Sequence, residues 1–231
     1  MHDYLLFLDT ETSGIPTSLH APITDLDNWP FVLQIAWLIY TPGGKLVKRE
    51  NLFIYEEDIY IKQSSERIHG ITREELQAKG LDRKSVMKAF ASDLRQYKPM
   101  IIGHFVEFDS KMVQVAFFRS GLKNIISPLK HFCTMLPTKA YARLPHNTYP
   151  KLEDLYFGLF KEKLEDTHNA LNDAEATAKC FFSLKDKGEI NEQVIASQRL
   201  FINFKDKKSS KAGCGLPILV FILIGLLSIW L

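Results

Sequence analysis

Cysteine is scarce in this chain of 231 residues, and its charges nearly cancel. The three cysteines, Cys133, Cys180 and Cys214, have neither zinc-finger spacing nor an even number, which argues against a disulfide scaffold and favours reduced thiols. No internal repeat or low-complexity tract is present, which excludes a repeat array. A formal net charge of +2 excludes a strongly basic binding module. These absences leave an ordinary globular domain.

An apolar run of strand length ends in two carboxylates. Residues 4–8 form the run, and Asp9 and Glu11 follow two positions apart, so both side chains lie on one face of an extended chain. Two carboxylates at the mouth of a buried strand repel each other and are costly to desolvate, which favours cations beside them. Oxygen ligands suit Mg²⁺ or Mn²⁺. The alternative is a solvated loop, because such tripeptides are common.

A third carboxylate, Asp109, follows the short apolar run 100–103 at the start of a helix predicted to end at Gly121. Its own helix face carries an apolar stripe at the third, fourth and seventh positions along: Met112, Val113 and Ala116. The carboxylate is therefore expected to point towards the sheet. A helix N-cap is the alternative for Asp109.

The fourth carboxylate, Asp173, shares the apolar face of a helix predicted over residues 170–184. The other members of that face are Ala170, Ala174, Thr177, Phe181 and Leu184. A carboxylate there needs a partner off the helix, either a basic residue or a metal ion. His168 lies five residues earlier and is expected on the preceding loop, near the same ions. A buried salt bridge and an ordinary surface histidine are the alternatives.

These segments resemble, in order, the motifs of the DEDDh (DnaQ-like) 3′–5′ exonuclease family, over residues 4 to about 184. The matching motifs are Asp9-x-Glu11, His104-x-x-x-Phe108-Asp109 and His168-x-x-x-x-Asp173. Residues 67–72 also resemble a substrate-side stretch of a family member, the epsilon subunit of DNA polymerase III. One departure is Phe105, where the family commonly has Asn, which puts a local polar contact in question.

The resemblance implies a two-metal phosphodiesterase. The carboxylates of Asp9, Glu11, Asp109 and Asp173 would hold two Mg²⁺ (or Mn²⁺) ions roughly 3.5 to 4 Å apart. His168 would be the general base, since an imidazole titrates at about pH 6.5. The substrate would be a DNA or RNA 3′ end, expected to be single-stranded, and the product a nucleoside 5′-monophosphate. Positions that cradle the terminal nucleotide in relatives correspond to Thr10, Thr12, Ile15, Ile68 and His69. As an alternative, the threonines suit strand packing and Ile68 and Ile71 suit the core.

The remaining pattern predicts an α/β fold of the ribonuclease H-like kind, with a mixed central β-sheet flanked by helices. Expected strands cover residues 4–8, 31–40, 46–55, 100–103 and 131–135, and expected helices cover 72–78, 82–97, 109–121, 152–160, 170–184 and 190–204. The loop 137–150 is expected to be a solvated surface loop or a lid that grips the strand.

Three parts are expected along the chain: an exonuclease domain over 1–188, a helix with a basic linker over 189–211, and a membrane tail over 212–231. Four lysines and one aspartate lie in 205–211, which leaves 25 basic and 26 acidic residues before them. The 20 uncharged residues that follow would span about 30 Å as a transmembrane helix. The lysines place the catalytic domain in the cytoplasm. A hydrophobic helix packed on the domain or in a dimer is the alternative. No signal peptide is expected, because charged residues lead straight into the first strand.

Two other functions stay open. One is a catalytically silent nucleic-acid-binding adaptor of the same fold. The presence of all five catalytic residue types argues against it. The other is a polymerase-associated proofreading subunit, for which a membrane tail would be awkward. No obligate protein partner is evident from the sequence.

Overall fold

A mixed five-stranded sheet forms the centre of the computed structural model, which describes residues 2–57, 59–143 and 148–200. The strand order is β3-β2-β1-β4-β5. β1 (Leu5–Thr12) pairs antiparallel with β2 (Val32–Tyr40), which pairs antiparallel with β3 (Leu46–Phe53). On its other side β1 pairs parallel with β4 (Met100–Gly103), which pairs parallel with β5 (His131–Cys133). The predicted mixed sheet is confirmed.

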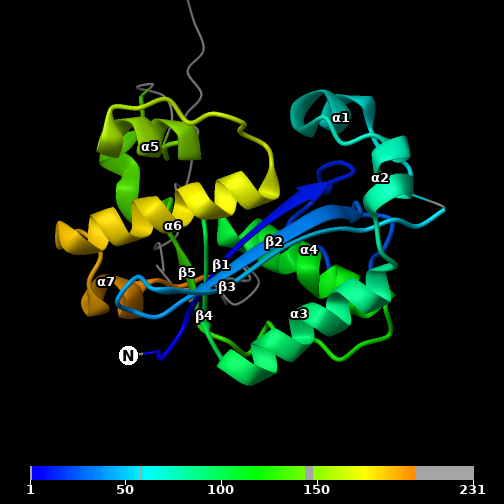
Figure 1. The fold of residues 1–231 in the computed structure, drawn as a ribbon, viewed down its shortest axis with the longest axis horizontal. Coiled ribbons are helices and arrows are strands. Elements are labelled where there is room, and N and C mark those ends of the chain that lie inside the picture. The colour runs from blue at the N-terminus through cyan, green and yellow to red at the C-terminus, as the bar shows by residue number, and fades with distance from the viewer. Residues whose placement is uncertain (1, 58, 144–147, 201–231) are drawn as a thin grey trace, which may run out of the picture. The chain divides into compact units, whose positions relative to one another are not determined.

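Helices cover both faces of this sheet (Figure 1). α3 (Arg83–Tyr97) and α4 (Val106–Arg119) share one hydrophobic core with the sheet, and α5 (Leu152–Phe160) and α6 (Ala170–Asp186) share the other. The shorter helices are α1 (Gln63–His69), α2 (Arg73–Lys79), the 3₁₀ helix η1 (Leu136–Tyr141) and α7 (Glu192–Ser197). The flanking helices confirm the expected α/β class.

β1 is the central strand, and its side chains alternate between the two cores. Leu6 and Leu8 pack towards α3 and α4, whereas Leu5 and Phe7 pack towards α6. The strand was expected to end at residue 8, but it continues to Thr12 because β2 goes on pairing with it. The first two carboxylates therefore lie within the strand rather than after it.

Two helices differ from the sequence-based expectation. α4 begins at Val106, so its N-cap is Phe105 and the N-cap interpretation of Asp109 is wrong. Of the helix expected over 190–204, the described residues, which end at 200, contain only α7, because Gln198 leaves the helical conformation. Its side-chain amide accepts from the Cys133 N–H and donates to the Cys133 carbonyl, both at 2.8 Å, which fastens the extended chain to β5. α1 was not expected at all.

Within the described part of the chain, no helix combines the length and apolar character needed to cross a bilayer. The segment predicted as a transmembrane helix, 212–231, lies outside the described residues, as does most of the basic linker.

Candidate active site

Asp9 and Glu11 project from β1 onto the face that α6 covers, as their spacing predicted. Glu11 is only 9% exposed. Burial raises the pKa of Glu11 to about 8, and the charges of Asp173 and Asp109 add to this shift. Burial also raises the pKa of Asp9 well above its ordinary value, with further contributions from Asp109, Asp173 and Glu11. Both groups favour a proton or another cation beside them.

Asp109 is buried in the first turn of α4, only 4% exposed. Its Oδ1 accepts a hydrogen bond of 2.8 Å from Oγ1 of Thr10, which lies on the opposite face of β1 from Glu11. Burial raises the pKa of Asp109 to about 7, although the bond from Thr10 opposes that shift. The described contact makes Thr10 a positioning residue for Asp109, and a contact of Thr10 with substrate stays a prediction.

Asp173 and His168 meet where the chain enters α6. His168 has a left-handed backbone (φ 63°) and precedes Asn169, the helix N-cap, so it lies on the loop as predicted. Its backbone N–H donates to Oδ2 of Asp173 at 3.1 Å. Burial raises the pKa of Asp173 to about 6, and this hydrogen bond opposes the shift. Oδ1 of Asp173 is buried without a hydrogen-bond partner, and no Lys or Arg of the described residues pairs with the carboxylate.

Three of the predicted groups come within ligand distance of a common point. Ligand atoms of Glu11, His168 and Asp173 all lie within 4.8 Å of one another. Asp9 and Asp109 lie outside this group of three, but their charges act on it, as the raised pKa values show. Oxygen and imidazole donors around an unpartnered carboxylate oxygen fit a divalent metal ion. The site can therefore bind metal.

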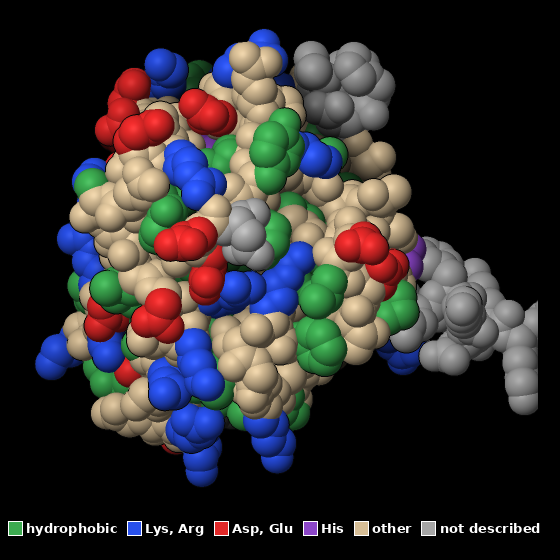
Figure 2. Space-filling view, turned by 90° about the vertical axis from the view of Figure 1, so that its right-hand side faces the viewer, with side chains coloured by type: hydrophobic (Ala, Val, Ile, Leu, Met, Phe, Trp, Pro, Cys, Tyr) green, Lys and Arg blue, Asp and Glu red, His purple; other side chains and the backbone are tan. Residues whose placement is uncertain are grey.

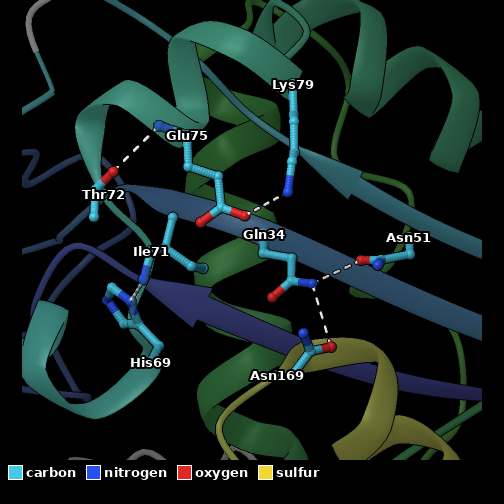
Figure 3. Close-up of polar contacts among 8 residues, drawn as sticks. All are labelled: Gln34, Asn51, His69, Ile71, Thr72, Glu75, Lys79 and Asn169. Carbon is cyan, nitrogen blue, oxygen red and sulfur yellow. Dashed lines mark hydrogen bonds and ion pairs between the residues drawn. The ribbon is translucent and has the colours of Figure 1, made fainter.

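The residues expected to cradle the terminal nucleotide differ in exposure. Ile15 is 74% exposed and Ile68 is 58% exposed, so the core interpretation of Ile68 is wrong, whereas Ile71 is buried. His69 accepts at Nδ1 from the Ile71 N–H, at 3.0 Å (Figure 3). Burial lowers the pKa of His69, and the nearby His168 also lowers it. Thr12 donates from Oγ1 to the Gly14 carbonyl at 2.6 Å. The two exposed isoleucines offer apolar surface beside the site.

Sequence reasoning missed Gln34, a fully buried side chain on β2 directly opposite Glu11. Figure 3 shows its amide between Asn51 and Asn169. Nε2 donates to Oδ1 of Asn51 at 2.8 Å and to Oδ1 of Asn169 at 3.5 Å, while Oε1 accepts from the Ala170 N–H at 3.2 Å. Gln34 therefore ties the start of α6 to the sheet. A lone amide in the apolar run VLQIAWLI was the available signal, since buried polar groups need partners.

His104 and Phe105 of the second motif support the site, whereas Asp109 of the same motif is a site carboxylate. Nε2 of His104 donates to the Pro150 carbonyl and Nδ1 accepts from Thr134, both at 3.0 Å. Burial lowers the pKa of His104 to about 4, so the ring is neutral. Phe105 adopts a left-handed backbone (φ 76°), a conformation that Asn tolerates better than Phe, and its ring stacks on Phe108.

The loop 137–150 is partly described, since 144–147 lie outside the described residues. Arg143 forms an ion pair of 3.4 Å with Asp154 of α5 and lies 4.1 Å from the ring centroid of Phe157. Lys139 lies over the ring of Tyr149. The contacts of Arg143 hold the loop against α5, that of Lys139 lies within the loop, and a function of the loop as a lid stays a prediction.

Comparisons with known proteins agree with this geometry. A family model, RNase_T (Exonuclease), matches residues 6–181. No curated protein gives a significant match. Among solved structures, exonuclease I from a study of its processivity has 20% identity and a TM-score of 0.66, covering 84% of this chain and 43% of that one. E. coli exonuclease I with a dA16 oligonucleotide has 19% identity and a TM-score of 0.67, covering 84% and 42%.

A zinc-ion-bound E. coli exonuclease I complex with single-stranded DNA has 20% identity and a TM-score of 0.66, covering 80% of this chain and 41% of that one. The chain thus spans less than half the length of the exonuclease I chains that it matches. At these identities the likeness shows the fold, a mixed sheet flanked by helices in a ribonuclease H-like exonuclease arrangement.

Proposed function

Because the chain belongs to the RNase_T exonuclease family, we propose that it is a DEDDh 3′–5′ exonuclease that releases nucleoside 5′-monophosphates from nucleic-acid ends. One observation carries this proposal: Glu11, His168 and Asp173 converge within 4.8 Å, and Oδ1 of Asp173 has no hydrogen-bond partner among the described residues. A buried carboxylate oxygen left unpartnered in such a group fits a metal-dependent hydrolase better than a purely structural role.

Two Mg²⁺ or Mn²⁺ ions would be held by Asp9, Glu11, Asp109 and Asp173. The raised pKa values of all four carboxyl groups support this, because each group favours a nearby cation over an empty neighbourhood. Bound divalent ions supply Lewis-acid stabilisation of the charge that develops on the phosphate oxygens.

His168 would accept the proton of the attacking water. His168 is exposed to solvent, and one of its ring nitrogens lies within 4.8 Å of a carboxylate oxygen of Glu11 and of Asp173. The bond from its backbone N–H to Asp173 orients the loop that carries it. Because the four carboxylates would be occupied by the metal ions, the imidazole of His168 would be the base left free to take this proton.

The terminal nucleotide would lie against Ile15 and Ile68, the two exposed apolar side chains beside the site, with His69 and Thr12 behind them. Single-stranded DNA is the favoured substrate, because similar exonuclease I structures contain oligonucleotides. The domain before the basic linker is nearly neutral, so affinity would depend strongly on the bound metals.

The proposal is tested with one single strand labelled at its 3′ end or at its 5′ end, incubated with Mg²⁺. We expect immediate release of labelled mononucleotide from the 3′ label and a descending ladder from the 5′ label. Asp173→Ala should abolish both, whereas Asp186→Ala, at the far end of the same helix, should not. Binding of the strand without release of mononucleotide would instead identify a silent adaptor. Matched DNA and RNA strands, with and without a 3′ mismatch, would define the substrate.

Anchoring by residues 212–231, with the catalytic domain in the cytoplasm, is a separate proposal supported by the sequence alone. The full-length protein should remain in the membrane fraction after alkaline extraction and dissolve in detergent. Release by alkali would contradict an integral anchor.

A further inference from the structure

A pocket of about 550 Å³ opens next to the end of β1, the strand that carries Asp9 and Glu11, between the loop that follows β1 and the segment that precedes α1. Ser13 and Ile15, which follow β1, line this pocket together with Tyr60 and Lys62. On the side of the molecule that lies to the right in Figure 1, basic side chains gather in the middle of the face among acidic and hydrophobic ones (Figure 2).

Lys62 is a fixed cation next to the catalytic strand. Its backbone N–H donates to the Ser13 carbonyl at 2.9 Å. Its aliphatic chain lies across Gly14, where an added Cβ would come within 3.0 Å of the Lys62 Cδ. Among the residues that the structure describes, no carboxylate forms an ion pair with its exposed ammonium. The charge is therefore placed beside the active site and is available to an anion.

Two arginines extend this positive surface. Arg83 pairs with Glu56 at 3.0 Å, yet its Nε is buried without a hydrogen-bond partner. Arg119 donates to the Pro30 carbonyl at 2.6 Å, and its guanidinium lies 4.0 Å from the ring centroid of Phe31, which orients it at the pocket. Asp27 is the only acidic side chain among the described residues that line the pocket, so cations outnumber carboxylates there.

Tyr60 adds an aromatic surface to the same pocket. Its side chain is 75% exposed, although an aromatic ring ordinarily gains free energy by burial. Exposed aromatic rings next to basic side chains are the combination that binds single-stranded nucleic acid, with bases on the rings and phosphates at the cations.

We propose that this pocket binds the single strand just upstream of its terminal nucleotide, with a base stacked on Tyr60 and a phosphodiester at Lys62 and Arg83. The proposal rests on the proposed exonuclease function, which supplies the strand. It also gives a nearly neutral domain a local means of holding a polyanion.

The test compares Tyr60→Ala and Lys62→Ala with the charge-matched control Lys187→Ala. Lys187 is exposed and caps the C-terminal end of α6, whereas the active site lies at its N-terminal end. Binding of a short fluorescent oligothymidylate is measured by anisotropy in EDTA at several salt concentrations. Tyr60→Ala should weaken binding on the order of tenfold, the effect of losing one base–aromatic stack. Lys62→Ala should lower the slope of log K against log salt by about 0.7, one phosphate contact. The control should match wild type.

A second substrate separates this proposal from the exonuclease proposal. The p-nitrophenyl ester of thymidine 5′-monophosphate has no upstream nucleotide to contact Tyr60 or Lys62, so the losses should be confined to the oligonucleotide. If both pocket variants bind the oligonucleotide with the affinity and salt slope of wild type, the pocket proposal is overturned, even if the ester is hydrolysed. If wild type hydrolyses neither substrate, the exonuclease proposal is overturned, while the binding data in EDTA still test the pocket proposal.

Discussion

Replacing Asp173 by Asn should stabilise the metal-free protein while weakening its response to divalent ions. Asn is nearly isosteric, and its Oδ1 can still accept the hydrogen bond from the His168 N–H. The substitution therefore removes a charge without removing the contact that holds the loop. The neighbouring carboxylates repel the charge that is lost: burial raises the pKa of Glu11 to about 8, and the charge of Asp173 adds to that shift.

The size of the effect follows from the distance between the carboxylates. Oxygens of Glu11 and Asp173 approach within 4.8 Å, and two full charges at that separation repel by about 3 kcal/mol at an effective dielectric constant of about 20. Asp173 is partly exposed, and solvent screening reduces this value. We expect the free energy of unfolding in EDTA to rise by about 1 to 2 kcal/mol near pH 9, where both carboxyl groups are ionised.

The assay is urea unfolding of the full-length protein in EDTA and in Mg²⁺. Asp93→Asn is the matched control, because Asp93 is a buried carboxylate with favourable partners: it accepts from Trp37 Nε1 and pairs with Lys48, both at 2.8 Å. Its replacement should lower stability by about 1.5 to 3 kcal/mol, the value of a charged hydrogen bond, and leave the response to Mg²⁺ intact.

Two results would refute the reasoning. Destabilisation of metal-free Asp173→Asn near pH 9 would mean that Asp173 is held by an attractive partner rather than repelled. An undiminished stabilisation by Mg²⁺ in the variant would mean that this carboxylate is not a metal ligand.

Three further predictions follow from the site. The folded-state pKa values of Asp173 (about 6), Asp109 (about 7) and Glu11 (about 8) lie above ordinary carboxyl values, so the folded protein binds more protons than the unfolded chain in that range. Unfolding midpoints in EDTA should therefore fall as pH rises from about 4 to about 8, and stabilisation by Mg²⁺ should grow; a rise of the midpoints would contradict this. His168→Gln should lower kcat by about 10²-fold to 10⁴-fold, measured by single-turnover kinetics, while Mg²⁺ still stabilises the protein in thermal unfolding. An unchanged kcat would exclude His168 as the general base. Gln34→Leu should reduce stability by about 1 to 3 kcal/mol and weaken Mg²⁺ binding measured by calorimetry, because the start of α6 loses its tie to the sheet; wild-type Mg²⁺ affinity would contradict that.

Local periodicity was enough to orient the predicted metal ligands. Asp9 and Glu11 share a face because strand side chains alternate, and Asp109 points inward because its helix neighbours are apolar. The position of His168 before the helix also follows from counting residues back from Asp173. These inferences involve only neighbours in the chain, where backbone geometry leaves few possibilities.

The sequence by itself thus determined the five strands, the longer helices α3 to α6, the order of the motifs and the resemblance to a nuclease family, but not α1 or η1. Only the tertiary structure decided which side chains support those ligands. Thr10 bonds to Asp109 across 99 positions, and Gln34 bonds to Ala170 across 136. Tyr60 and Lys62 line a pocket with residues from other parts of the chain. Such contacts depend on how the elements pack in space, and no periodic pattern in the chain encodes them.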